Sequence, residues 1–234
     1  MRLFFIRHGE PIYDPDSLTP LGHEQAKALS KRFLAKGLDK VYASASNRAI
    51  QTAQPTCDLL RKEPIICDWA HEALAFDDFK AKDKDGKEQW ILDVPEMVRK
   101  LNDPEVKKLG AQWYTHPCFA DTNFERGVKR VDAAVDAFME ELGYRHDREN
   151  GCYYIIEGVE KKPNRVALFA HYGFGLAFLS SLMDIPYNVF YPRFNIGLTG
   201  MTEILFYHHG DGMVIPQILQ HAGDGHLYRE GLLR

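Results

Sequence analysis

The chain has 234 residues, 45% of them hydrophobic and 26% charged, which is ordinary for a folded soluble protein and enough for a sizeable core without disulfide or metal staples. Its formal net charge of −4 is small, so neither nucleic acid nor a membrane surface is expected as a partner. The four cysteines form no C-x-x-C pair typical of zinc or redox sites, which favours reduced thiols and a cytoplasmic location.

The first expected element is a strand at residues 3–6, where a continuous apolar run indicates burial on both faces. This run is too short for a secretory signal, and no later segment reaches the length of a membrane-spanning helix. Thr19 and Pro20 then predict the start of a helix, as N-cap and first-turn proline. The helical spacing of apolar residues continues to Phe33, and Gly37 ends the helix.

A second strand is expected at 41–43, followed by a helix that Ser46 caps and that stops before Pro64. The stretch 73–121 has a different character, with a polar run at 80–89 and a predicted helix near 95–109. We interpret this stretch as a lid inserted into a single domain that spans residues 1–234.

The remaining elements complete an alternation of strands and helices. Thr122-x-x-Glu125 has the form of a capping box before a strongly amphipathic helix that Gly143 closes. We expect strands at 153–156 and 166–170, a helix at 176–183, and a hairpin of 201–207 with 213–219 joined through Asp211 and Gly212. The pattern predicts a three-layer α/β/α fold with a mainly parallel sheet, helices on both faces and an antiparallel C-terminal edge.

Two histidines occupy equivalent positions in this pattern. His8 directly follows the first buried strand, and His171 directly follows the strand at 166–170. Ligands in such folds gather beyond the carboxyl ends of the strands, so neighbouring strands would bring both imidazoles to one pocket. A surface pair or a core histidine explains either one alone. Both together favour a site.

Two arginines strengthen this interpretation. Arg7 places a planar fork of donors, suited to phosphate oxygens, beside His8. Arg48 lies in the first turn of its expected helix, where a cation is unfavourable unless an anion binds. A solvated arginine remains an alternative for Arg48 taken alone.

Four motifs together resemble the histidine phosphatase superfamily, which includes cofactor-dependent phosphoglycerate mutases and many phosphatases. They are Arg7-His8-Gly9-Glu10, the segment 18–26, the segment 42–53, and Ala170-His171. The resemblance implies that His8 attacks phosphorus and becomes a phosphohistidine, while Arg7, Arg48 and His171 hold the phosphoryl oxygens. It implies Glu72 as the acid that protonates the leaving oxygen, with Asp77 and Asp78 as rivals. Tyr172 departs from the glycine that often follows the second histidine in this family; its ring could form a wall of the binding pocket or simply pack.

Such chemistry needs no metal or other cofactor, because the two arginines neutralise the charge that a metal ion neutralises elsewhere. His208 and His209 beside Asp211 resemble metal ligands, but a solvated hairpin turn explains them better.

The substrate expectation rests on departures from the mutases. The segment between the first motif and Leu18 is short, and Asp14 stands near a family asparagine, where a carboxylate would repel a second anionic group. We therefore expect a phosphatase acting on a small phosphorylated metabolite, with a phosphomutase and a non-catalytic phosphate-binding module as alternatives. Trp90, Trp113 and Tyr114 could stack on an aromatic leaving group, although core packing explains each better. The sequence is compatible with a homo-oligomer.

Overall fold

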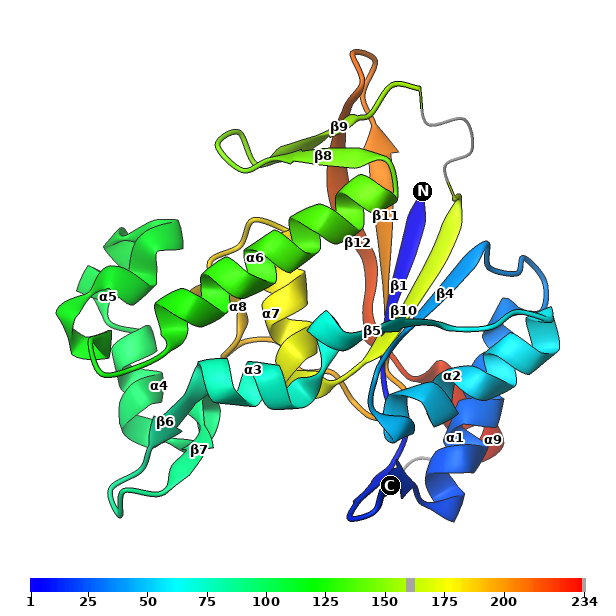
Figure 1. The fold of residues 1–234 in the computed structure, drawn as a ribbon, viewed down its shortest axis with the longest axis horizontal. Coiled ribbons are helices and arrows are strands. Elements are labelled where there is room, and N and C mark those ends of the chain that lie inside the picture. The colour runs from blue at the N-terminus through cyan, green and yellow to red at the C-terminus, as the bar shows by residue number, and fades with distance from the viewer. Residues whose placement is uncertain (159–162, 233–234) are drawn as a thin grey trace.

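The computed structural model describes residues 1–158 and 163–232, which are built around a central eight-stranded sheet (Figure 1). The strand order is β5-β4-β10-β1-β11-β12-β9-β8. The strands are β1 (Arg2–Arg7), β4 (Lys40–Ser44), β5 (Ile65–Cys67), β8 (Tyr144–Asp147), β9 (Cys152–Ile155), β10 (Arg165–Ala170), β11 (Met201–His208) and β12 (Met213–Gly223).

Helices cover both faces of the sheet (Figure 1). On one face lie α1 (Pro20–Ser30), α2 (Asn47–Leu60) and α9 (Gly225–Glu230), and on the other α3 (Glu72–Phe79), α6 (Phe124–Glu141) and α7 (Tyr172–Leu182), with the short α8 (Tyr187–Phe190) after it.

Each face of the sheet has its own apolar core, because successive side chains of a strand point to opposite faces. Phe4 and Ile6 of β1 pack against the α1–α2 side, in a cluster that includes Leu29 and Cys57. Leu3 and Phe5 belong to the larger cluster on the other side, which includes side chains of α3, α6 and α7. The predicted α/β class in three layers is therefore confirmed.

The sheet is mixed. Strands β5, β4, β10 and β1 are parallel to one another, and all pairings from β1 through β11, β12 and β9 to β8 are antiparallel. The antiparallel part is wider than the expected C-terminal edge, because β8 and β9 join it beyond the hairpin of β11 and β12. The site expected from the sequence falls in the parallel half.

Two expected helix features differ from the structure. The helix expected at 95–109 is split into α4 (Pro95–Leu101) and α5 (Pro104–Lys108), since a proline cannot donate the helical hydrogen bond and disfavours helical conformation before it. The predicted capping box does not form: α6 begins at Phe124 with Asn123 as N-cap and without a side-chain cap.

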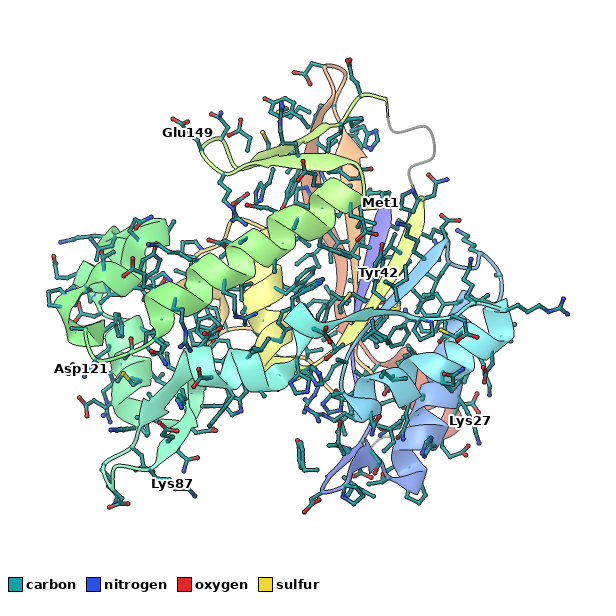
Figure 2. The ribbon with its side chains drawn as sticks, viewed as in Figure 1. Met1, Lys27, Tyr42, Lys87, Asp121 and Glu149 are labelled. Carbon is teal, nitrogen blue, oxygen red and sulfur yellow. The ribbon has the colours of Figure 1, made fainter. Side chains whose placement is uncertain are left out.

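The insertion at 73–121 contains most of α3, the hairpin of β6 (Lys80–Lys82) and β7 (Glu88–Trp90), and α4 and α5. Figure 2 shows Lys87 and Asp121 on its outer side, far from Tyr42 in the sheet. Trp113 and Tyr114 are buried in the core, as their packing interpretation expected, and Trp113 stacks on Tyr187. A further hairpin, β2 (Pro11–Tyr13) with β3 (Asp16–Leu18), follows β1. No helix within the described ranges is long and apolar enough to cross a membrane.

Candidate active site

The two histidines lie side by side at the carboxyl end of the sheet. Strands β1 and β10 are parallel neighbours, and Arg7 is paired in register with Ala170. The residue that follows each strand is a histidine. The backbone N–H of His8 donates to Ala170 O at 2.9 Å. The centroids of the His8 and His171 rings are 5.3 Å apart. The juxtaposition that the sequence suggested is present.

The environment of His8 sets its tautomer and its charge. Nδ1 lies 2.7 Å from Gly9 O, and because a carbonyl only accepts, Nδ1 carries the proton and Nε2 has the free lone pair. Burial, with the charges of Arg7 and Arg48, lowers the pKa of His8 to about 3. His8 is therefore a neutral imidazole at physiological pH, with an available nucleophilic nitrogen.

Both arginines are held close to this imidazole. Arg7 Nη1 donates to Ile196 O at 2.8 Å, and Arg48 Nη1 donates to Asp16 Oδ1 at 2.6 Å. The Nε atoms of Arg7 and Arg48 are buried, and neither has a hydrogen-bond partner among the described residues. Asp16 also accepts from the backbone N–H of Asn47 at 2.7 Å. The sequence analysis did not identify Asp16 as a site residue and considered Asp14 instead. Asp14 is exposed in the turn between β2 and β3.

His171 is fully buried, and two serines hold it. Its Nε2 lies 2.8 Å from Ser44 Oγ and 3.1 Å from Ser46 Oγ, while Nδ1 is buried without a partner in the described part of the chain. Burial, followed by the charges of His8 and Arg48, lowers the pKa of His171 strongly. Ser46 is the N-cap of α2 without a side-chain cap, because its hydroxyl faces His171. Neither serine contact was predicted.

Glu72 begins α3 and reaches the first turn of α7. Its Oε1 accepts from Gly173 N at 2.9 Å and its Oε2 from Phe174 N at 2.8 Å. Burial raises the pKa of Glu72 even though these N–H bonds and the arginine charges oppose the shift. The two rivals lie elsewhere: Asp77 and Asp78 form ion pairs with Arg126.

A cavity of about 370 Å³ joins Arg7, His8, Arg48 and Glu72. His171 contacts the His8 ring but is not among the residues that line the cavity. Tyr172 lines it as expected, with its ring 5.1 Å from the guanidinium carbon of Arg7. Trp90 packs tightly over the start of α7, because a Cβ on Gly173 would lie 2.3 Å from its indole. The lining residues are Arg7, His8, Tyr13, Arg48, Glu72, Trp90, Leu92, Asp93, Tyr172 and Tyr191.

Several residues that line the cavity could not be predicted from the sequence. Tyr13, Leu92, Asp93 and Tyr191 come from separate segments and were not predicted to line a site. Of the two histidines that resemble metal ligands, His208 ends β11 and contacts Tyr144, whereas His209 lies in the hairpin turn as expected. No group of three or more His, Cys, Asp or Glu side chains that could hold a metal occurs within residues 1–158 and 163–232.

The arrangement is suited to moving a group with a tetrahedral, anionic centre. A neutral imidazole provides a lone pair, two guanidinium groups provide positive charge, and a carboxyl with a raised pKa provides a proton. Each task has a separate residue within one cavity.

Comparisons with known proteins agree with this description. The sequence model of the histidine phosphatase superfamily (branch 1) matches residues 3–216. A relative from Hydrogenobacter thermophilus, named "Putative phosphoserine phosphatase 2", is 25% identical over 62% of this chain and 68% of its own length.

Solved structures share the fold. Phosphoserine phosphatase (a mutant with bound phosphoserine) from Entamoeba histolytica has a TM-score of 0.58 at 18% identity, covering 97% of this chain and 98% of its own. Alpha-ribazole phosphatase from Shigella flexneri also has a TM-score of 0.58, at 16% identity, with 96% and 97% covered.

Proposed function

Since this chain belongs to the histidine phosphatase superfamily, we propose that it is a metal-independent phosphatase that hydrolyses small phosphate monoesters through a phosphohistidine at His8. The observation that carries the proposal is the convergence of His8, His171, Arg7 and Arg48 at one end of the sheet. A nucleophile without positive charge beside it, or the reverse, would fit a binding site better than phosphoryl transfer.

The first half of the reaction forms the phosphoenzyme. Nε2 of His8 attacks phosphorus, and a nitrogen–phosphorus bond forms as the bond to the leaving oxygen breaks. Arg7 and Arg48 neutralise the phosphoryl oxygens, and His171 contributes a further contact. Glu72, whose pKa burial raises, gives its proton to the leaving oxygen.

The second half returns the enzyme to its starting state. The Glu72 carboxylate accepts a proton from water as the water oxygen attacks phosphorus. The nitrogen–phosphorus bond breaks, and orthophosphate leaves with Glu72 protonated again. No step needs a metal ion, since the charge of the transferring group is balanced by guanidinium groups.

The wall of the cavity favours a phosphatase over a phosphomutase. A mutase must also hold a second anionic group of its substrate. Among the described residues, the arginines that line this cavity, Arg7 and Arg48, both act on His8, and the remaining charged lining residues, Glu72 and Asp93, are acidic. A pure phosphate-binding module would have no use for the free Nε2 of His8 or for the raised pKa of Glu72.

The test is hydrolysis of an aryl phosphate by purified protein in excess chelator, for the wild type and for His8→Ala. We expect turnover by the wild type and a fall of about four orders of magnitude or more in the variant, with an unchanged circular dichroism spectrum. An active His8→Ala protein would refute the nucleophile assignment. Activity that requires a bisphosphoglycerate primer would support the mutase, and phosphate binding without turnover would support the module.

We propose that 73–121 acts as a lid on a single domain of residues 1–234, because Trp90, Leu92 and Asp93 of this stretch line the cavity. A cytoplasmic location and a homo-oligomer stay predictions from the sequence.

A further inference from the structure

Three residues that line the cavity, besides the catalytic groups proposed above, form a surface suited to a particular leaving group. They are Trp90, Asp93 and Tyr191, and Asp93 forms no ion pair with any described residue. Trp90 and Asp93 come from β7 and the 3₁₀ turn Ile91–Asp93, and Tyr191 follows α8. Two segments that are distant in the sequence therefore contribute a carboxylate and aromatic rings to the same cavity.

The positive charges and Asp93 act on different residues of the cavity. The two guanidinium groups act on His8, and each lies close to an aromatic ring: Arg7 to Tyr172 at 5.1 Å and Arg48 to Tyr13 at 5.5 Å. Asp93 is exposed without a cationic partner among the described residues, and its charge acts on Tyr172 and Tyr191. A substrate with an anionic head and a cationic tail matches this arrangement.

The two aromatic residues beside Asp93 in the cavity lining, Trp90 and Tyr191, are each packed against another aromatic ring. Trp90 and Phe76 form a T-shaped pair with ring centroids 5.2 Å apart, and the Trp90 indole lies against Gly173. Tyr191 is buried and stacks on Tyr187 at 4.6 Å. Rigid aromatic faces beside a carboxylate are the means by which proteins recognise ammonium groups.

From this geometry we propose that the substrate is a phosphate monoester of a cationic amino alcohol, whose ammonium group is bound by Asp93 beside the aromatic rings of Trp90 and Tyr191. The proposal rests on the phosphatase function proposed above and adds a substrate class to it. Asp93 repels a leaving group that carries a carboxylate, so it is a specificity-determining residue, and it does not touch the transferring phosphoryl group.

The test uses three two-carbon substrates that differ in the charge of their tail: phosphoethanolamine, 2-hydroxyethyl phosphate and phosphoglycolate. We expect kcat/KM to decrease in that order. Because the three alcohols differ as leaving groups, each value is compared between the wild type and Asp93→Asn. The variant should lose about five- to tenfold on phosphoethanolamine, mostly through KM, gain on phosphoglycolate, and change least on 2-hydroxyethyl phosphate.

One control variant and one further test variant make the result specific. Asp85→Asn removes the same charge from the exposed turn of the β6–β7 hairpin, outside the cavity, and should leave all three values as in the wild type. Trp90→Phe, which keeps a weaker aromatic face, should reduce the preference for phosphocholine over its neutral isostere 3,3-dimethylbutyl phosphate.

An aryl phosphate separates the two levels of the proposal. If the wild type hydrolyses it but treats ammonium and carboxylate tails alike, or if Asp93→Asn changes nothing, the substrate class is wrong and the phosphatase stands. If the wild type hydrolyses neither the aryl phosphate nor any of the other esters, the phosphatase itself fails.

Discussion

Glu72 combines two features that a general acid needs: a place in the wall of the cavity and a pKa raised by burial. Its two backbone hydrogen bonds to Gly173 and Phe174 fix the direction of the carboxyl group. The role assigned to this residue can be separated from that of the nucleophile, because an acid matters less when the leaving group departs easily.

We predict that Glu72→Gln slows turnover of an alkyl phosphate by about 100-fold or more, within the usual contribution of acid–base catalysis. With an aryl phosphate, the first step should survive and water attack should not. Stopped flow should then show a burst of phenol equal to the enzyme concentration, followed by slow turnover. Asp77→Asn is the control, since its carboxylate pairs with Arg126 on the surface. A burst from Asp77→Asn and none from Glu72→Gln would reverse the assignment.

The residues found from the sequence share one property: a short motif or a strand end marks each of them. Arg7 ends β1, His8 and His171 follow β1 and β10, and Arg48 lies in the first turn of α2. Asp16 and Asp93 carry no such mark, because their contacts depend on how separate elements pack. Ser44 ends β4, but its contact with His171 could not be read from that position. Only the folded chain brings Asp16 to Arg48, or Asp93 to the cavity.

At the scale of elements, the contact of Trp90, at the end of β7, with Gly173 of α7 joins the insertion to the site. Gly173 makes that contact possible, since any Cβ there would overlap the Trp90 indole at 2.3 Å. The same residue donates its N–H to Glu72. Gly173 therefore affects both the packing of the insertion and the orientation of the Glu72 carboxyl group.

Gly173→Ala should lower the free energy of unfolding by about 1–3 kcal/mol through overpacking, and raise KM. The two effects should couple to Trp90. In a Trp90→Leu background the added methyl group has room, so the cost of Gly173→Ala should shrink in a double-mutant cycle measured by urea unfolding. Gly225→Ala is the control, because nothing lies within 4 Å of its would-be Cβ. Additive costs for Gly173→Ala and Trp90→Leu would contradict the packing account.

The elements missed in the sequence include the two edge strands of the sheet, β5 and β8. An edge strand is less buried than a central one, and β5 exposes Ile65 and Ile66 while β8 contains mostly polar residues. Central strands such as β1 and β10 were found because burial on both faces makes them continuously apolar. The predicted capping box failed for a different reason: Thr122 satisfies the N-cap pattern locally, but the helix starts one residue later.

At the scale of the whole molecule, buried neutral histidines make stability depend on pH. Burial is the main cause that lowers the pKa of His8 to about 3 and that of His226 to about 4, from the ordinary 6.5. His171 and His221 are shifted in the same direction, whereas the pKa of His146 is raised. Below pH 6.5 the unfolded chain therefore binds more protons at the first four histidines, and folding weakens as pH falls.

Between pH 6.5 and 5 each strongly lowered histidine should reduce the free energy of unfolding by up to about 2 kcal/mol, partly offset by His146, whose stabilising charge is present at low pH. Urea unfolding across this range should show the decline. His226→Gln removes one such group outside the cavity and should make the slope shallower. Constant or rising stability on acidification, or an unchanged slope in the variant, would show that these imidazoles are not buried in neutral form.

The most direct test of the account is to locate the phosphoryl group after rapid acid-free quenching of the Glu72→Gln protein with an aryl phosphate. We predict one phosphoryl group per chain on the peptide that contains His8, stable in base and lost in acid. A label on another residue, or turnover without any trapped label on His8, would contradict it.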